Sequence, residues 1–241
     1  MSATRDDGLS RNIERVIDEQ EVVGELVELD HKRILDLGCG RAQHTRAVAA
    51  GGPGREVVAL EVDEVQHRRN LALDDLPNVR FGLGGAEQIP AGDSAFDVVF
   101  LFKSLHHVPV ASMDKALDEI ARVLRPGGVA YVSEPLYRDG YNEVVRIFHD
   151  EREVRLCASD AIDRALGRGV LELVTQAFFR APVRFADFAE FERLVIGATH
   201  SAHVLTPEQR ARTRAAFARH MGPEGAEFAQ PIRVDLLRRP A

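Results

Sequence analysis

Apolar and polar positions follow one another in blocks along the first 136 residues. Five short runs, rich in branched and aromatic residues, predict buried strands because their hydrophobic residues are contiguous instead of alternating with polar ones. The second run, for example, reads EVVALEVD. The predicted strand segments cover residues 33–40, 56–63, 78–83, 95–102 and 128–135.

Between these runs the apolar residues recur every three or four positions, which is the period of a helix with one buried face. An opening helix is predicted over residues 10–29, with Ser10 as its N-cap. Further helices are predicted directly after residue 40, over 64–76 and over 112–124. Helices of this length between strands favour right-handed crossovers, and therefore an α/β fold with a doubly wound parallel sheet.

The pattern changes after residue 137. Residues 141–180 and 185–196 have mostly helical periodicity, and Thr206 followed by Pro207 predicts the start of another helix. Residues 231–240 are again strand-like, and apolar enough to join a sheet.

A single domain over residues 1–241 is the expected organisation, because the last strand-like segment would return to the main sheet. Its parts are the opening helix, a core over residues 33–136, a mostly helical elaboration over 138–230 and a closing strand over 231–240.

The composition, with 45% hydrophobic and 29% charged residues, is that of an ordinary soluble protein. No apolar run is long enough to cross a bilayer, and the N-terminal residues are charged where a signal peptide is apolar. We therefore expect a cytoplasmic protein without membrane contact. The net charge of −7 arises within residues 1–138, and no basic cluster stands out, so a nucleic-acid partner is not expected.

Cysteine and histidine spacing predicts no metal site. Cys39 and Cys157 form neither a disulfide framework nor a CxxC pair. The remaining histidine group, His149, His200 and His203, lies in the helical elaboration at spacings that favour surface positions.

In an open parallel sheet, ligands bind beyond the carboxyl ends of the strands. Four groups of candidate residues fall there: 36–40, Glu61, 84–87 and 103–107. The glycines of the first group permit a tight turn and close approach of a ligand, and the following helix N-terminus attracts an anionic group. An acid about 20 residues later, here Glu61, can accept hydrogen bonds from two ribose hydroxyls. These features predict a ligand that contains adenosine.

Two nucleotide signatures are incomplete or missing. The GxGxxG fingerprint has Gln43 at its last position, which disfavours NAD and FAD without excluding them, and the sequence has no GxxxxGK[ST] motif for a P-loop.

Five segments together resemble the class I S-adenosylmethionine-dependent methyltransferases: RILDLGCG, the acid in ALEVDE, GGAEQIP, FDVVFLFKSLHHV and EIARVLRPGGVAYVSEP. They follow the family's order and spacing over residues 33–136. The resemblance implies a Rossmann-like, doubly wound, mostly parallel sheet of seven strands, with S-adenosyl-L-methionine as the cofactor. It also implies an in-line methyl transfer as the reaction.

Family roles can be carried over to matching positions. Asp36, Gly38 and Gly40 would line the methionine end of the cofactor. His44 and Thr45, near the first helical turn, would reach its carboxylate.

The adenosine end would be bound by the next two strands. Glu61 would bind the ribose hydroxyls, and Val62 would pack on the adenine. Ala86 would offer its backbone N–H to the adenine ring, with Gly85 and Glu87 beside it.

Phe102 and Lys103 would lie beside the sulfonium and the ribose. Two positions depart from the family's pattern. Gly85 stands where an aspartate often accepts from the adenine amine, so that bond is either missing or made by Glu87. Ala42 stands where a third glycine is common.

The acceptor-side candidates for catalysis are His106 and His107 after the fourth strand, with Glu134 and Tyr137 after the fifth. One histidine would act as a base or orient the acceptor; the alternative is hydrogen bonding within the loop. Glu134 is either functional or a buried hydrogen-bonding carboxylate.

The favoured function is methyl transfer to a small-molecule acceptor. The alternatives are a non-catalytic module that holds S-adenosylmethionine or S-adenosylhomocysteine, a protein methyltransferase, and a nucleotide-dependent oxidoreductase on a similar sheet. The charge-balanced helical elaboration is also a candidate surface for a homodimer.

Overall fold

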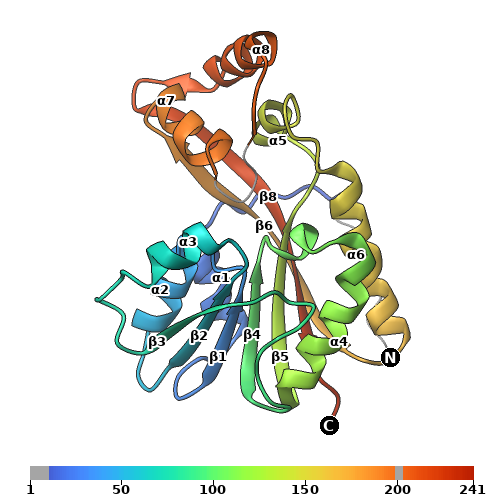
Figure 1. The fold of residues 1–241 in the computed structure, drawn as a ribbon. Helices are drawn as coiled ribbons and strands as arrows, with labels where there is room; N and C mark the ends of the chain where they lie inside the picture. The colour runs from blue at the N-terminus through green and yellow to red at the C-terminus, as the bar shows by residue number, and fades with distance from the viewer. Residues whose placement is uncertain (1–10, 199–202) are drawn as a thin grey trace.

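A twisted sheet forms the centre of the computed structural model, which describes residues 11–198 and 203–241 (Figure 1). The strands, in chain order, are β1 (Arg33–Leu37), β2 (Glu56–Glu61), β3 (Val79–Leu83), β4 (Phe96–Phe102), β5 (Leu124–Pro135), β6 (Glu172–Phe185), β7 (Met221–Gly222) and β8 (Gly225–Arg238). Along the main path their order is β3-β2-β1-β4-β5-β8-β6, and β7 pairs with β8 beside this path.

The first five strands are parallel to one another. Strand β8 is antiparallel to both of its neighbours, β5 and β6, so β6 runs in the same direction as β5. The predicted α/β fold with a doubly wound, mostly parallel sheet is confirmed. Seven strands lie on the main path, and the two-residue β7 is an addition to them.

Helices connect the strands and cover the sheet (Figure 1). They are α1 (Glu19–Leu26), α2 (Gln43–Ala50), α3 (Glu64–Asn70), α4 (Met113–Val123), α5 (Gly140–Val145), α6 (Arg152–Gly167), α7 (Phe188–Phe191) and α8 (Pro207–Ala218). Short 3-10 turns, η1 (Leu105–His107) and η2 (Val110–Ser112), follow β4. A π-helical turn over Glu192–Ile196 continues α7.

Strand β4 shows why its sequence is apolar on both sides. Val99 and Leu101 pack into a cluster with α4 and α6 on one face of the sheet. Phe100 and Phe102 alternate with them and pack into a second cluster with α1 and α2. Because successive side chains of a strand point to opposite faces, a strand covered by helices on both sides has contiguous apolar residues.

The predicted opening helix over residues 10–29 is wrong in length. Helix α1 begins only after Asp18, whose side chain accepts a hydrogen bond from the backbone N–H of Gln20 at 2.8 Å. The preceding segment is extended instead, because Ile17 donates to the backbone carbonyl of Arg180 at 3.0 Å. Ser10, the predicted N-cap, lies outside the described residues.

The prediction of a mostly helical elaboration is also wrong in one large part. Residues 172–185 form β6, although we expected helix to continue to residue 180. Pro182 and the many branched and aromatic residues of ELVTQAFFRAPVRF suit an edge strand better than a helix. The closing strand is longer than predicted, since β8 begins at Gly225.

Smaller boundaries differ in the same way. Helix α3 ends at Asn70 instead of continuing to residue 76. Ser112 precedes α4 as expected but makes no capping bond with its side chain. The predicted start of α8 is confirmed, because Thr206 and Gln209 cap it reciprocally.

A third apolar cluster lies away from the main sheet faces. Helices α5, α7 and α8 meet the beginning of β8 and the end of β6 around a group of aromatic rings. The buried members of this group are Phe185, Phe188, Phe191, Phe217 and Phe228. Among the residues that the structure describes, no helix is long and apolar enough to span a membrane.

Candidate cofactor and acceptor site

The turn between β1 and α2 depends on glycine at residue 38. Gly38 has φ +72°, and a Cβ atom there would lie 2.9 Å from Cβ of Ser104 in the loop after β4. Gly40 also has positive φ, of +51°, but a Cβ at residue 40 would meet nothing within 4 Å. Because Gly38 has no side chain, the end of β1 can lie against the loop that follows β4.

Asp36 projects from the end of β1 into this region and is buried. Its Oδ2 accepts a hydrogen bond from Thr45 Oγ1 at 2.6 Å, whereas its Oδ1 has no hydrogen-bond partner in the described part of the chain. Burial raises the pKa of Asp36 to about 6, against the opposing hydrogen bond from Thr45. An unpartnered buried carboxylate oxygen is an acceptor suited to a ligand ammonium group.

Glu61 lies at the corresponding end of β2. Its carboxylate accepts hydrogen bonds from the backbone N–H groups of Gly40 at 2.8 Å, Val62 at 2.8 Å and Asp63 at 2.9 Å. A carboxylate has about four acceptor sites, so a hydroxyl donor can still bind. Directly after it, Val62 is 62% exposed, which leaves an apolar surface beside the acid.

The loop after β3 contains the departure from the family's pattern at Gly85. A Cβ built on Gly85 would lie 2.4 Å from a carboxylate oxygen of Glu87. The Glu87 carboxylate therefore occupies the space that a side chain at residue 85 would use. Ala86 between them is 7% exposed.

The backbone conformation of Ala42 accounts for the glycine that is common at this position in the family. Ala42 adopts φ +58° in the left-handed region, and this residue precedes the first turn of α2. A side chain in that conformation is strained by roughly 1–2 kcal/mol.

His44 and Phe102 stack face to face, with ring centroids 4.2 Å apart. Nδ1 of His44 lies 2.8 Å from Nε2 of Gln20, and its Nε2 lies 3.9 Å from Oε2 of Glu19. Burial, together with the charge on Lys103, lowers the pKa of His44 to about 4. The ring is therefore neutral at pH 7.

Helix α1 reaches the site through a residue that the sequence analysis did not single out. Glu19 is 3% exposed and forms an ion pair with Nζ of Lys103, directly after β4. Burial alone would raise the pKa of Glu19, but the Lys103 ammonium and His44 hold it below its usual range. Glu19 stands in an amphipathic helix pattern, where a charged residue normally indicates a solvated face.

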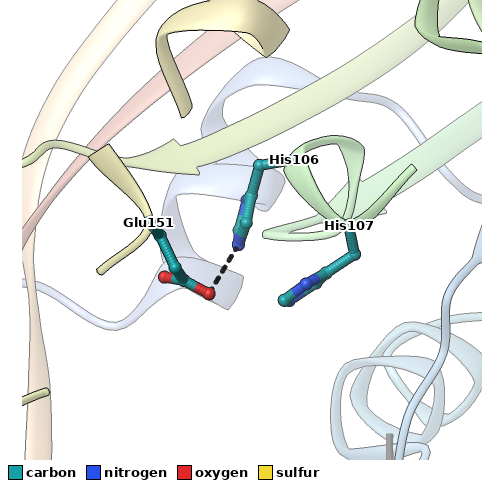
Figure 2. Close-up of side chains that lie close together, drawn as sticks. All are labelled: His106, His107 and Glu151. Carbon is teal, nitrogen blue, oxygen red and sulfur yellow. Dashed lines mark ion pairs between the residues drawn. The ribbon is translucent and has the colours of Figure 1, made fainter. Parts of the chain in front are cut away.

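His106 is buried between two carboxylates. Its Nδ1 lies 2.5 Å from Oε2 of Glu134, and its Nε2 lies 3.6 Å from Oε1 of Glu151, just before α6 (Figure 2). Burial would lower the pKa of His106, but Glu134 and Glu151 outweigh it and raise the value to about 9. The pKa values of both carboxyls are held below their usual range, against burial, chiefly by His106.

His107 is exposed, and its ring centroid lies 4.1 Å from that of His106. Glu151 was missed in the sequence because one acid among several in a helical stretch gives no signal of its own. His149, expected at the surface, is half-buried with Nε2 2.9 Å from Glu151, and its ring lies 4.4 Å from that of His203. His200 lies outside the described residues.

Tyr137 is half-buried, and the guanidinium carbon of Arg152 lies 5.9 Å from the centroid of the Tyr137 ring. With Glu134, Tyr137 lines a cavity of about 300 Å³ between the end of β5, α6 and β8. The other lining residues include three arginines, Arg152, Arg155 and Arg233. The buried Nε atom of Arg155 has no hydrogen-bond partner in the described part of the chain.

The structure thus arranges the sequence-predicted residues in two neighbouring groups. Asp36, Glu61 and Glu87 stand at the ends of β1, β2 and β3 or in the loops that follow. His106 and Glu134 follow β4 and end β5, and they are in contact. Lys103 lies between the groups in sequence, three residues before His106.

Known proteins resemble this chain in sequence and in fold. Residues 34–128 match the family described as methyltransferase domain. The demethylmenaquinone methyltransferase of Clavibacter sepedonicus is 38% identical over 120 residues, covering 46% of each chain. The biotin biosynthesis bifunctional protein BioHC of Cellvibrio japonicus (strain Ueda107) is 29% identical over 233 residues, covering 88% of this chain and 43% of that one.

The chain spans less than half the length of these two curated relatives. Among solved structures, the YcgJ protein from Bacillus subtilis superposes with a TM-score of 0.60 at 15% identity, covering 92% of this chain and 97% of that one. At that sequence identity the structural similarity shows a shared fold and nothing about activity.

Proposed function

We propose that this chain is a class I S-adenosylmethionine-dependent methyltransferase that transfers a methyl group to a small-molecule acceptor; residues 34–128 match the methyltransferase domain family. The observation that carries the proposal is the contact between Glu61 and the Gly40 N–H. It joins a glycine turn to an acid at the next strand end, which is the arrangement that binds an adenosine ligand.

The residues present fit the methionine end of S-adenosylmethionine. The unpartnered Oδ1 of Asp36 offers a buried acceptor to the cofactor's ammonium group. The close approach of Gly38 to Ser104 keeps side chains out of the turn. Phe102 presents an aromatic ring next to this turn, held in place by His44.

The residues after β2 and β3 fit the adenosine end. Glu61, fixed by three backbone N–H groups, would accept from the ribose hydroxyls. The exposed side chain of Val62 would cover the adenine, and Glu87 would accept from its amine in place of the missing side chain at Gly85. The backbone N–H of Ala86 would complete the contact.

When bound, the cofactor supplies a methyl group already activated by its sulfonium. The chain's task is then to hold the acceptor close and to exclude water. The cavity beside Tyr137, of about 300 Å³, has the size of a small-molecule pocket. Tyr137 and Glu134 line this cavity. Together with His106 and His107 they are the residues proposed to contact or orient the acceptor.

Within this group Glu134 is a positioning residue. It accepts from the ring of His106 at 2.5 Å and from the His106 backbone N–H at 3.3 Å, which sets the ring's orientation. His107, exposed beside it, is the histidine with open access to an acceptor.

Calorimetric titration of the protein with S-adenosylmethionine, S-adenosylhomocysteine and NAD tests the cofactor assignment. We expect saturable binding of the first two and none of NAD. Tight NAD binding without a response to the methyl donor would overturn the proposal in favour of an oxidoreductase.

Release of S-adenosylhomocysteine in the presence of a metabolite extract tests the reaction. Turnover that depends on the low-molecular-weight fraction supports a small-molecule acceptor. Turnover only with the protein fraction indicates a protein methyltransferase, and binding with no turnover in either fraction indicates a non-catalytic module.

A further inference from the structure

Two histidines and a carboxylate converge beside the acceptor cavity. His106 and His107 come from the short turn after β4, and Glu151 comes from the residue before α6 (Figure 2). One ligand atom from each, an imidazole nitrogen or a carboxylate oxygen, lies within 4.8 Å of the other two. Nε2 of His106 and Oε1 of Glu151 are 3.6 Å apart, close to the edge of a zinc coordination tetrahedron.

The ring of His106 is oriented as in a metal site. Its Nδ1 faces the Glu134 carboxylate at 2.5 Å, which leaves Nε2 directed toward Glu151. Histidines that bind metals usually donate their second ring N–H to a carboxylate or carbonyl in this way, which fixes both tautomer and orientation.

Hydrogen bonds also fix the orientation of the Glu151 carboxylate. Its Oε2 accepts from Nη2 of Arg155 at 2.5 Å, and Nη1 of Arg155 donates to Asn142 at 3.2 Å. Although Glu151 occupies the N-cap position of α6, its side chain makes no capping hydrogen bond. Its Oε1 instead lies 2.9 Å from Nε2 of His149 and 3.6 Å from Nε2 of His106.

A charged imidazole between two carboxylates would account for His106 and Glu151 alone. His107, on the same short turn, adds a third ligand candidate, with its ring centroid 4.1 Å from that of His106. A third nitrogen or oxygen donor at this distance is what a metal ion requires and an ion pair does not.

We propose that His106, His107 and Glu151 bind one divalent transition-metal ion, for which Zn²⁺ is the best match. Two imidazoles and one carboxylate disfavour Mg²⁺ and Ca²⁺, which prefer oxygen ligands. Three protein ligands leave at least one coordination position for another molecule. That position would hold an oxygen atom of the acceptor; this role rests on the proposed function, whereas the metal site does not.

This proposal revises the expectation of no metal site. That expectation considered cysteine pairs and His149, His200 and His203, whereas Glu151 lies 44 positions after His107. No spacing motif within one element joins them.

The test uses the full chain stripped of metal by a chelator and titrated with Zn²⁺ by calorimetry, and with Co²⁺ by visible absorption. We expect one site per chain and the intense d–d bands of a four-coordinate cobalt ion. Absence of saturable Zn²⁺ binding and of these bands would overturn the proposal.

Substitutions of the proposed ligands test whether the metal binds at this site. His107→Ala and Glu151→Gln should each weaken Zn²⁺ binding at least about 100-fold, and Glu134→Gln about 10- to 100-fold through the orientation of His106. His31→Asn, at an exposed histidine before β1, is the matched control and should bind as the wild type does. Unchanged affinity in both His107→Ala and Glu151→Gln would also overturn the site.

Binding of S-adenosylhomocysteine is measured on the same samples. It reports that each variant is folded, and it separates the two proposals. Metal binding without cofactor binding would leave the metal site standing and refute the proposed function, and the reverse result would refute only the metal site.

Discussion

The ion pair between Glu19 and Lys103 predicts unequal costs for removing its two members. The Glu19 side chain is 3% exposed, whereas that of Lys103 is 27% exposed. Oε1 of Glu19 also has no hydrogen-bond partner in the described chain. Lys103→Met therefore leaves a buried carboxylate without its cation, while Glu19→Gln leaves an ammonium group that can reach water.

The magnitudes follow from this difference in burial. Breaking a buried pair by removing one partner costs about 3–5 kcal/mol, so we expect that loss in the free energy of unfolding for Lys103→Met. For Glu19→Gln we expect about 1–2 kcal/mol, because the remaining charge stays hydrated. At roughly 2–4 °C per kcal/mol for a chain of this size, the two variants should differ clearly in Tm.

The double variant gives the sharpest result. Adding Glu19→Gln to Lys103→Met removes the buried charge, so the double variant should be more stable than Lys103→Met alone. Urea unfolding at pH 7 measures all four proteins as a double-mutant cycle. Equal losses in the two single variants, or a double variant whose loss is their sum, would refute the reasoning.

The pH dependence adds an independent check. In the wild type the pKa of Glu19 is lowered, so its contribution to stability is present above the pKa of an unfolded glutamate, about 4.3, and is lost as the pH falls through the folded value. Without Lys103, burial dominates and the folded pKa rises. The deficit of Lys103→Met relative to the wild type should therefore be smaller at pH 4 than at pH 7.

Three further predictions concern the cofactor site. Glu61→Gln should weaken S-adenosylmethionine binding about 10- to 100-fold in calorimetry, since hydrogen bonds to a charged acceptor are the stronger ones; an unchanged affinity would remove Glu61 from the ribose site. Gly38→Ala should lower stability more than Gly40→Ala in thermal melts, because only residue 38 combines positive φ with a Cβ contact to Ser104, and equal losses would contradict this. Asp36 has a folded pKa near 6, above its unfolded value, so ionisation of its buried carboxyl destabilises the fold progressively as the pH rises from about 4 to 6. The free energy of unfolding of Asp36→Asn, measured in urea, should therefore rise relative to that of the wild type by on the order of 2 kcal/mol over this range. A difference that stays constant with pH would refute the pKa shift.

The sheet and the position of the cofactor residues could be predicted because both depend on local patterns. Contiguous apolar runs encode strands buried on both faces, and the carboxyl ends of parallel strands meet at one edge. Asp36, Glu61 and Glu134 were therefore placed correctly at strand ends. Strand β6 was missed because half-buried residues with mixed polarity, such as Thr175 and Gln176, have neither a clear helical nor a clear strand period.

Glu19 and Glu151 could not be found in the sequence. Each stands among other acids in a predicted helical stretch, where the ordinary position of a carboxylate is a solvated face. Glu19 pairs with a residue 84 positions away, and Glu151 lies 45 positions from His106. Such contacts depend on how the helices are placed over the sheet, which no local period encodes.

The place of β8 in the sheet has a consequence for the order in which the chain folds. Residues 225–238 are inserted between β5 and β6, and β6 has no other strand partner in the described sheet (Figure 1). During synthesis the parallel strands β1–β5 emerge long before β8, and the 14 residues of β6 emerge before the strand that pairs with them along their length. We infer that this half of the sheet forms late and at long sequence separation, which makes it the slow step of folding and the stage most exposed to aggregation.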